Sequence, residues 1–479
     1  MFCNILIVSS LLAVVHAQQV GTFQPENHPP VTWQRCTSKD NCTTNQRSIA
    51  LDANWRWLHQ TGSYSNCYSG NTWDTSYCNT NIDCAQRCAL EGADYQNTYG
   101  ISTSGSQVRL NYVTDHANGR NVGSRVYMME SDTHYEIYKL LNQEFTFTVD
   151  VSELPCGLNG ALYLVAMDVD GGIANGTSNS AGARYGTGYC DAQCPRDVKF
   201  IKGLANIEGW QLSPNNSMSG AGNHGSCCAE LDIWESNSMA QVLTAHPCDT
   251  PTNTMCTGDA CGGPHSSNRD AGPCDPNGCD FNPYRVGNAS FYGPPNKILD
   301  SSLPFTVVTQ FITNDGTSNG TLTEIRRFYV QRGITDAQPS ASLNGLSGNT
   351  INSEFCIAEN TLFQGPDNFA RHGGLAKVSE AMAQGMVLVM SIWDDWFTHM
   401  LWLDSAFPPQ EDAKKPGVGR GECSRLSGDP QQLQTSNPNA YVAFSDIKVG
   451  PINSTFNNES VQTWPASINP GILVVLQLP

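Results

Sequence analysis

The sequence has few charged residues, and few basic ones in particular. Lys and Arg number 26 against 44 Asp and Glu, so the formal net charge is −18, and charged residues make up only 15% of the 479 positions. The shortage of positive charge argues against nucleic acid or a membrane surface as a partner. Because 39% of the residues are hydrophobic, the chain can still build a core. The 10 Trp and 16 Tyr suit a neutral ligand rich in hydroxyl groups better than a charged one.

Long hydrophobic runs are missing as well. The apolar run at residues 5–15 is too short to span a bilayer, and so is the run at 472–478. The first run leads to Val15-His16-Ala17, a small-x-small pattern typical of a cleavage site. We therefore expect residues 1–17 to be a signal peptide and the protein to be secreted and extracellular. A buried N-terminal strand is the alternative.

The cysteines agree with an oxidising compartment. Of the 19 cysteines, Cys3 would leave with the signal peptide, and the remaining 18 can form nine disulfides. The spacings Cys190–Cys194 and Cys256–Cys261 are loosely metal-like, but no paired His ligands follow, so neither a metal nor a cofactor is expected. No Cys-x-x-Cys motif supports a disulfide oxidoreductase. Glycosylation is expected at some of the Asn-x-Ser/Thr sites, which are Asn41, Asn175, Asn215, Asn288, Asn319, Asn453 and Asn458.

Internal repeats, linkers and long helical patterns are also lacking, whereas Gly (43) and Pro (26) are plentiful. Short alternating or apolar runs bounded by turn residues indicate strands. We expect strands at 145–151, 161–168, 305–311, 327–331, 386–393 and 441–449, with a hairpin between the third and fourth, and helices only at 84–91 and 378–383. This pattern predicts an all-β fold, an antiparallel two-sheet sandwich of the jelly-roll kind.

The segment from Ala229 to Asn237 (AELDIWESN) carries three acids. On a strand, Glu230 and Asp232 share one face, whereas strict alternation would send Glu235 to the other. A one-residue β-bulge near Ile233-Trp234 would return Glu235 to the acidic face. Two glutamates so placed can approach to about 5–5.5 Å, the spacing of retaining glycosidases. A solvated strand face or a calcium site is the alternative.

Three acids on one face repel each other and push their pKa values apart. One glutamate can then stay ionised as a nucleophile while the other stays protonated as a general acid.

Many motifs together resemble glycoside hydrolase family 7, the secreted cellobiohydrolases and endoglucanases that cut β-1,4-glucan. The motifs are ENHPPVTWQRC, ALDANWRW, PCGLNGALY, YGTGYCDAQCPRD, HGSCCAELDIWESN, CDPNGCDFNPYR and the segment 386–405. The resemblance implies a curved β-sandwich whose long loops form a substrate cleft or tunnel. It also implies a single catalytic domain at 18–452, followed by a tail at 453–479 without a carbohydrate-binding module.

The resemblance assigns roles to the acids. Glu230 matches the nucleophile, Glu235 the acid/base and Asp232 the carboxylate that positions the nucleophile. His246 matches a nearby histidine with a supporting role. The implied reaction is a double displacement through a covalent glycosyl-enzyme.

The resemblance also supplies binding residues. Trp55 and Trp57 are two apart, so we expect both rings on one face of a strand, with Trp57 facing ligand and Trp55 near the site. The other cleft residues implied are Tyr163, Asp191, Gln193, Arg269, Asp280, Arg285, Trp393, Trp402 and Arg420. The three arginines would hold product sugars. From the residues alone, core tryptophans, solvated arginines and a simple Asp280–Arg285 pair remain alternatives.

The family register implies nine disulfides: Cys36–Cys42, Cys67–Cys88, Cys78–Cys84, Cys156–Cys423, Cys190–Cys228, Cys194–Cys227, Cys248–Cys274, Cys256–Cys261 and Cys279–Cys356. The chain departs from relatives at Gly21 and Ala89, where many carry one more disulfide. His265 and Phe397 stand where a tyrosine pair commonly meets over the tunnel, which implies a roof that opens more easily. Asn277 stands where an acid is common near the product sites.

The leading functional hypothesis is a reducing-end cellobiohydrolase, acting as a monomer on cellulose chains and cello-oligosaccharides. Its alternatives are an endoglucanase of the same family and a glucan-binding, non-catalytic jelly roll. Loops 210–225, 262–273 and 344–355 fill places where endoglucanases tend to be shorter, which favours the cellobiohydrolase. The three close acids argue against a mere binding protein.

Overall fold

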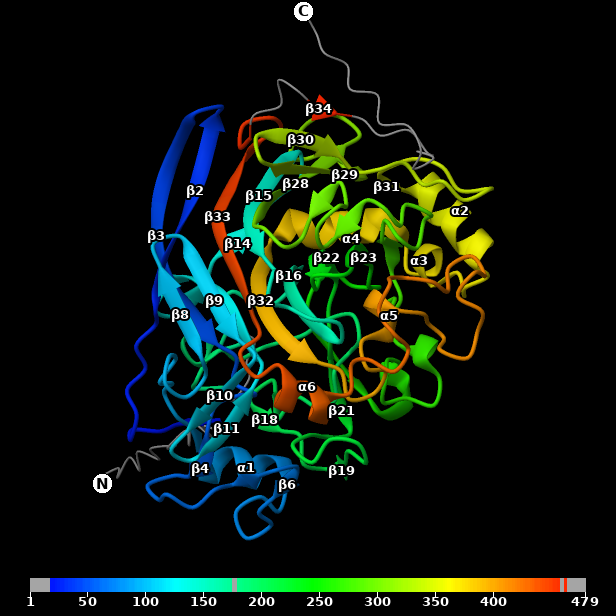
Figure 1. Ribbon diagram of the computed structural model, residues 1–479. Helices are drawn as coiled ribbons and strands as arrows, with labels where there is room; N and C mark the ends of the chain where they lie inside the picture. The colour runs from blue at the N-terminus through cyan, green and yellow to red at the C-terminus, as the bar shows by residue number, and fades with distance from the viewer. Residues whose placement is uncertain (1–17, 175–178, 457–460, 463–479) are drawn as a thin grey trace, which may run out of the picture.

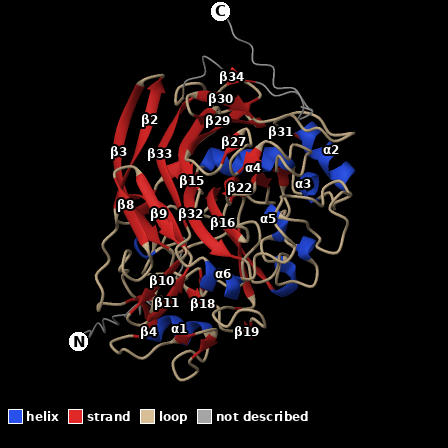
Figure 2. Ribbon diagram, viewed as in Figure 1, coloured by secondary structure: helices blue, strands red, loops and turns tan. Residues whose placement is uncertain are grey.

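The computed structural model describes residues 18–174, 179–456 and 461–462. The expected signal peptide, most of the expected tail, and the sites Asn175 and Asn458 lie outside the described residues. Strands dominate the described chain, and long loops and short helices gather on one side of the sheets (Figures 1 and 2). No described helix is long and apolar enough to cross a membrane.

Two curved, mainly antiparallel sheets form the sandwich. Hydrogen bonding orders the first sheet as β3 (Asn41–Leu51), β12 (Ser124–Ser131), β32 (Met386–Asp394), β16 (Leu158–Val165), β22 (Glu230–Ser236), β23 (Gln241–His246) and β25 (Cys279–Phe281). The second runs β8 (Ile101–Ser104), β9 (Gln107–Asn111), β33 (Tyr441–Pro451), β15 (Gln143–Asp150), β28 (Phe305–Thr313), β29 (Leu322–Gln331) and β30 (Ile334–Ala337). Strand β2 (Pro30–Ser38) pairs with both β3 and β33 and so joins the sheets.

Shorter strands decorate the loops. They include β1 (Gln19–Val20), β4 (Leu58–Gln60), β5 (Tyr68–Ser69), β6 (Thr72–Trp73), β7 (Cys88–Leu90), β10 (Val113–His116), β11 (Gly119–Val122), β19 (Gln211–Leu212), β20 (Gly220–Ala221), β21 (His224–Cys227), β24 (Thr254–Thr257) and β31 (Ile351–Asn352).

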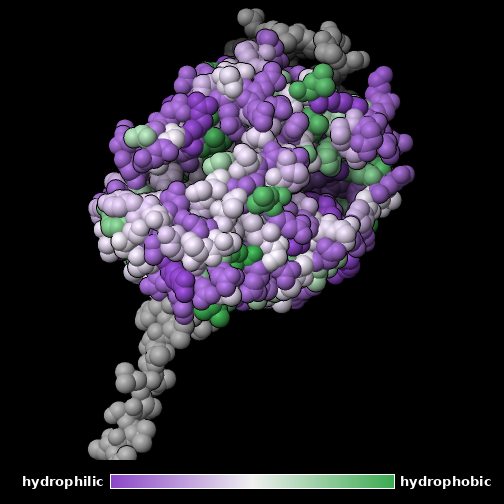
Figure 3. Space-filling view, turned by 90° about the horizontal axis from the view of Figure 1, so that it is seen from below, coloured by the Kyte–Doolittle hydropathy of each residue, from purple (hydrophilic) through white to green (hydrophobic). Residues whose placement is uncertain are grey.

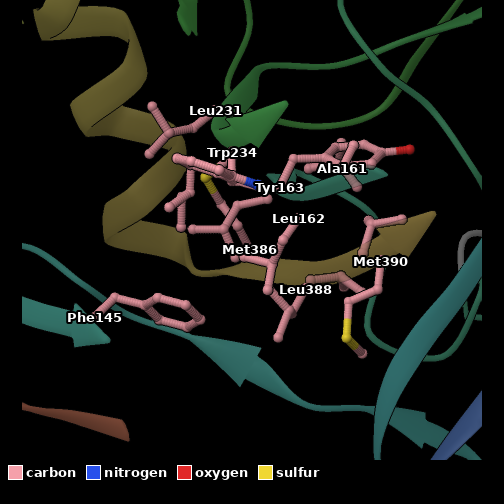
Figure 4. Close-up of a cluster of buried hydrophobic side chains, with 14 of the residues drawn as sticks. Phe145, Ala161, Leu162, Tyr163, Leu231, Trp234, Met386, Leu388 and Met390 are labelled. Atoms are coloured by element: carbon pink, nitrogen blue, oxygen red, sulfur yellow. The ribbon is translucent and has the colours of Figure 1, made fainter. Parts of the chain in front are cut away.

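The core lies between the sheets. Side chains from β15, β16, β22 and β32 meet there (Figure 4). Phe145, Leu162, Leu231, Trp234 and Leu388 are each fully buried. Removing such side chains from water stabilises the fold by roughly 1.5–3 kcal/mol each. All eight residues of β16 are buried.

The six predicted strands are confirmed, with ends that differ by up to five residues. The predicted run 161–168 is strand β16, which begins at Leu158 and ends at Val165. The run 327–331 is the end of β29, and its antiparallel pairing with β28 confirms the hairpin. Alternation locates a strand well, but its ends depend on partners that are far away in the sequence.

The helix predictions were partly wrong. Helix α1 spans Asn81–Arg87, and the predicted helix at 84–91 continues instead as strand β7 (Cys88–Leu90), which pairs with β4. The prediction at 378–383 lies inside α4 (Gly374–Gln384). The structure also contains α2 (Ser353–Phe363), α3 (Asn368–Arg371), α5 (Leu401–Asp404) and α6 (Pro430–Ser436). Two had visible start signals, since Asn352 caps α2 and Asp429, followed by Pro430, caps α6.

All nine predicted disulfide pairings are confirmed. The bond Cys156–Cys423 joins residues 267 positions apart, just before β16 and after α5. It ties the C-terminal loops to the first sheet. Cys190–Cys228 and Cys194–Cys227 hold the loop at 190–194 against the end of β21 and the residue after it, just before the strand that carries the acids.

Candidate active site

A β-bulge in β22 brings the predicted acids together. Glu230 pairs with Val165 of β16 and His246 of β23, and Glu235 pairs with Ala161 and Val242. Five steps along β22 therefore match four steps along each neighbour. Because side chains alternate with a period of two, the extra residue returns Glu235 to the face of Glu230. The predicted bulge near Ile233-Trp234 is confirmed.

The second sheet supports the bulge from behind. Nη2 of Arg327, on β29, donates a hydrogen bond to the carbonyl oxygen of Ile233 at the bulge. Arg327 is only 1% exposed and its guanidinium lies over the Trp234 ring, 6.0 Å from the centroid. No ion-pair partner for it occurs within the described part of the chain. No sequence pattern singled out Arg327, because a charged side chain on a strand normally predicts exposure.

Glu230 is held by the backbone of a neighbouring loop. The Ala192 N–H donates to its Oε2 at 3.1 Å. The side chain is buried, with the residue 7% exposed, and Asp232 is 5% exposed. The acids therefore do not form a solvated strand face, which was one alternative from the sequence.

Asp232 and His246 form a buried ion pair across β22 and β23. His246 Nε2 lies 3.0 Å from Asp232 Oδ2, and His246 Nδ1 lies 2.9 Å from the Asp275 carbonyl oxygen. Burial alone would lower the pKa of His246, but the hydrogen bond and charge of Asp232 outweigh it and raise that pKa to about 9. A protonated ring donates in both directions and fixes Asp232 beside Glu230.

One ligand atom from each of Glu230, Asp232 and His246 lies within 4.8 Å of the other two, which is close enough to bind a cation. Both ring nitrogens of His246, however, already have the partners described above.

Glu235 is oriented by Asn159 on β16. Asn159 Nδ2 donates to Glu235 Oε1 at 2.9 Å, while Asn159 Oδ1 accepts from the Ser236 N–H at 3.0 Å. The amide therefore has both ends fixed and holds the carboxyl from one side. Sequence reasoning missed Asn159, since an Asn inside an apolar strand shows no partner in the sequence.

Burial and a shared acidic neighbour affect both glutamates. Burial, followed by repulsion from Asp232, raises the pKa of both Glu230 and Glu235 well above the usual range. The Ala192 N–H opposes the rise at Glu230, and the Asn159 amide opposes it at Glu235. Once one of the pair ionises, its charge helps keep the proton on the other. The site thus places two glutamates with raised pKa values on one face, the setting in which one carboxyl can keep its proton while the other ionises.

Trp393 and Trp402 form an aromatic wall beside Glu235. Trp393 ends β32 and pairs with Asn159 on β16, while Trp402 lies in α5. Their rings stack with centroids 6.3 Å apart and an interplanar angle of 28°. The indole N–H of Trp402 donates to Asp395 Oδ2 at 3.2 Å, and Asp395 also accepts from the N–H groups of Phe397 and Thr398. Asp395, another residue that the sequence did not single out, thus fixes this wall.

The predicted strand for Trp55 and Trp57 is wrong. Both residues lie in a turn between β3 and β4, and the rings diverge. Trp55 packs against the core and donates to the Val122 carbonyl oxygen at 3.3 Å. The indole N–H of Trp57 donates to Asn66 Oδ1 at 2.7 Å, and its ring contacts His59 at an angle of 30°, with centroids 4.2 Å apart. A turn breaks the period of two, so spacing alone misplaced the pair.

Asp191 and Tyr163 lie in a buried network near Glu230. Tyr189, missed from the sequence, joins them: its hydroxyl donates to Asp191 Oδ2 at 2.6 Å and lies 3.0 Å from the Tyr163 hydroxyl. Burial raises the pKa of Asp191 to about 6. Arg125 stacks over the Tyr189 ring, 3.2 Å from its centroid. This network adds a further acid whose charge depends on pH near the predicted nucleophile.

Gln193 and Arg269 lie together at one end of the site. Arg269 Nη2 donates to Gln193 Oε1 at 2.8 Å, and its Nε donates to Asn277 Oδ1 at 3.2 Å. The amide of Asn277 also donates to Asp270 Oδ1 at 3.1 Å. Arg269 is exposed, so its guanidinium is both positioned and accessible.

The remaining predicted polar residues form one buried cluster. Arg285 Nη1 donates to Asp280, and to Glu359 Oε1 at 3.0 Å. The predicted Asp280–Arg285 pair is thus present, but it belongs to a larger group that includes Arg420. Burial, followed by the charge of Arg285, lowers the pKa of Arg420 to about 9. The buried Nε of Arg420 and Oδ2 of Asp280 have no hydrogen-bond partner within the described residues.

His265 and Phe397 meet edge to face. Their ring centroids lie 5.6 Å apart at an interplanar angle of 81°, and Phe397 is 51% exposed. The loops that contain residues 265 and 397 therefore touch through these rings. An edge-on contact without a hydrogen bond between the side chains is weak, about 0.5–1.5 kcal/mol.

Comparisons with known proteins identify the family of this chain. The model of a family described as "Glycosyl hydrolase family 7" matches residues 20–456. A cellobiohydrolase from Daphnia pulex is 48% identical, with 92% of this chain and 100% of that chain covered and a TM-score of 0.90. A cellobiohydrolase from Melanocarpus albomyces, solved with cellotetraose, is 47% identical over 92% and 100% of the two chains, with a TM-score of 0.87. An endocellulase from Humicola insolens is 35% identical over 91% and 100%, with a TM-score of 0.77.

Proposed function

We propose that this chain, which belongs to glycosyl hydrolase family 7, hydrolyses β-1,4-glucosidic bonds of cellulose and cello-oligosaccharides with retention of configuration. The observation that carries the proposal is the bulge in β22, which puts Glu230 and Glu235 on one buried face. The cellotetraose held by the Melanocarpus relative supports the substrate class.

In the first step, Glu235 donates its proton to the glycosidic oxygen while a carboxylate oxygen of Glu230 attacks the anomeric carbon. The bond from that carbon to the glycosidic oxygen breaks, the alcohol leaves with the proton, and a glycosyl ester forms on Glu230. The Ala192 N–H and Asp232 hold the Glu230 carboxylate for attack, and His246 keeps Asp232 in place.

In the second step, Glu235, now ionised, takes a proton from water as the water oxygen attacks the anomeric carbon. The ester bond to Glu230 breaks, and both glutamates return to their starting charges. The two inversions restore the β-configuration. Asn159 stabilises Glu235 when it is ionised, because its amide donates a hydrogen bond to the carboxylate.

Action from a chain end, releasing cellobiose, is the proposed mode. This chain is more similar to the two cellobiohydrolases, with 47–48% identity and TM-scores of 0.87–0.90, than to the Humicola endocellulase, with 35% identity and a TM-score of 0.77. The contact of His265 with Phe397 supports a covered path, which a chain end enters more readily than a chain middle. Arg269 and Arg420 would hold the product sugars at the reducing end. The alternative is endo-cleavage through a roof that opens readily.

Secretion as a monomeric catalytic domain at 18–452 completes the proposal. Nine disulfides are typical of an extracellular protein, and the family match at 20–456 fits one domain. A non-catalytic glucan-binding protein would have no need of the buried acids.

Chromatography of the products from crystalline and soluble cellulose tests the proposed function. We expect mostly cellobiose from both, with little early loss of viscosity in the soluble substrate. Rapid viscosity loss with scattered oligosaccharides would establish the endoglucanase instead. No sugar release from either substrate would refute hydrolysis.

A further inference from the structure

Four aromatic rings form one cluster around Trp57, with interplanar angles between 6° and 30°. Trp57 contacts His59 in a tilted arrangement, with centroids 4.2 Å apart, and the ring of Phe23 stacks on His59, with centroids 5.1 Å apart. Phe23 and Tyr64 stack face to face, with centroids 4.4 Å apart and planes within 6°. Tyr64 also lies 6.0 Å from Trp57. The cluster therefore continues from a predicted cleft residue, Trp57, to two residues that no cleft prediction included.

The outer rings of this cluster are exposed. Tyr64 is 75% exposed and Phe23 is 38% exposed, whereas His59 is buried beneath them. The segment that carries Tyr64 follows β4, at the lower end of the molecule in Figure 1. Seen from below, the surface is largely hydrophilic, with hydrophobic side chains in separate spots (Figure 3). Two stacked rings open to solvent on such a face mark a binding surface more readily than scattered apolar residues do.

The rings are held in place by buried polar groups. Glu91 accepts from the N–H groups of Phe23 and Gln24 at 3.0 and 2.9 Å, and its Oε1 lies 2.8 Å from His59 Nε2. Glu91 is 1% exposed, so these bonds are shielded from water. One buried carboxylate thus fixes the Phe23 backbone against the ring that supports Trp57.

The Tyr64 loop is equally well fixed. The Gln60 N–H donates to the Ser65 carbonyl oxygen at 2.8 Å, and His59 Nδ1 lies 2.7 Å from the Ser63 carbonyl oxygen. The disulfide Cys67–Cys88 closes the loop behind it. A ligand that stacks on Tyr64 therefore meets a preorganised ring, which lowers the entropy cost of binding.

We propose that Phe23 and Tyr64 extend the Trp57 surface into an aromatic platform that binds β-1,4-glucan outside the catalytic cleft, at a cellulose surface. This rests on the proposed function, since it takes the same polymer as ligand. Flat aromatic rings fit the apolar face of a glucose ring. The cluster includes no Lys or Arg side chain that could recruit an anion. A neutral polysaccharide also meets no repulsion from a protein with a net charge of −18.

The test measures adsorption to microcrystalline cellulose in a Glu230→Gln background, so that cleavage does not confuse binding. We expect Tyr64→Ala to weaken adsorption about threefold to tenfold, the range of one aromatic stacking contact, and Phe23→Ala to act in the same direction. Tyr64→Phe should adsorb as the parent does. Ile334→Ala is the matched control, because it removes a 45% exposed apolar side chain from β30.

A second measurement separates this platform from the catalytic machinery. Without the Glu230 substitution, Tyr64→Ala should cleave an aryl β-cellobioside, which has only two sugars, at the rate of the parent. Failure of the parent to cleave it would refute the proposed function and leave the adsorption result interpretable. Adsorption of Tyr64→Ala equal to that of the parent and of Ile334→Ala would overturn the platform, including the case in which the rings bind a protein.

Discussion

Arg327 and Ile233 lie on opposite sheets of the sandwich, and a hydrogen bond from the guanidinium to the carbonyl oxygen joins them. Ile233 lies in the bulge that aims Glu235. The second sheet therefore contributes to the active site without reaching it. Burying a guanidinium without a carboxylate partner destabilises the fold. We therefore infer that Arg327 is there to position the bulge.

We expect Arg327→Met to reduce kcat about tenfold to a hundredfold while KM changes less than about twofold, since small misplacements of a reacting group cost this much. Steady-state kinetics on an aryl cellobioside measures both. Arg326→Met is the control, because Arg326 is the exposed neighbour on the same strand and pairs with Glu324. If Arg327→Met does not fold, Arg327→Lys takes its place. A folded variant with the kcat of the parent would refute the positioning role.

Asn159→Ala should move the basic limb of the pH profile to higher pH. The Asn159 amide lowers the pKa of Glu235, so its loss raises that pKa further, and the general acid stays protonated at higher pH. The measurement is kcat/KM against pH for parent and variant. A limb that stays in place or moves to lower pH would contradict the assignment of Glu235 as the acid.

His246 should make stability depend on pH. Its pKa is raised to about 9 in the folded protein, against a usual 6.5, so the folded state binds the extra proton. The resulting stabilisation is complete below pH 6.5 and is lost as pH rises through 9, by about 3 kcal/mol. Urea unfolding with intact disulfides should show this decline in the parent and a flatter curve for His246→Gln. If the stability of His246→Gln fell with pH in parallel with that of the parent, the raised pKa of His246 would not be the cause of the decline.

Phe397→Ala should make the enzyme less strictly exo-acting. The variant removes the edge contact with His265, so the two loops separate more readily and admit a chain middle. We expect faster viscosity loss per bond cleaved on soluble cellulose, with unchanged cleavage of an aryl cellobioside. Equal viscosity curves for variant and parent would mean that other contacts close the path.

The sequence predicted the sandwich and the acidic face because both follow from local alternation. Even the bulge was predictable, since Glu235 can join Glu230 only through one extra residue. The residues that hold the catalytic and aromatic side chains in place were not predictable in the same way. Asn159, Asp395 and Arg327 act on residues 76, 7 and 94 positions away, through a neighbouring strand, a turn and the opposite sheet. Their own segments carry no sign of these partners.

The tryptophans show the limit of spacing arguments. Trp55 and Trp57 have the spacing of a strand, yet the chain turns there and sends one ring to the core and the other to the aromatic cluster. The disulfide pairings, by contrast, came from the family resemblance and hold throughout. Spacing alone could not have given them, because eighteen cysteines allow far too many connectivities.

The central claim is that Glu230 and Glu235 act as the nucleophile and acid of a retaining hydrolase. Proton NMR of the first product released from a cello-oligosaccharide tests it most directly. The account predicts that the β-anomer appears first and then mutarotates. Appearance of the α-anomer first would contradict the double displacement and the roles of both glutamates.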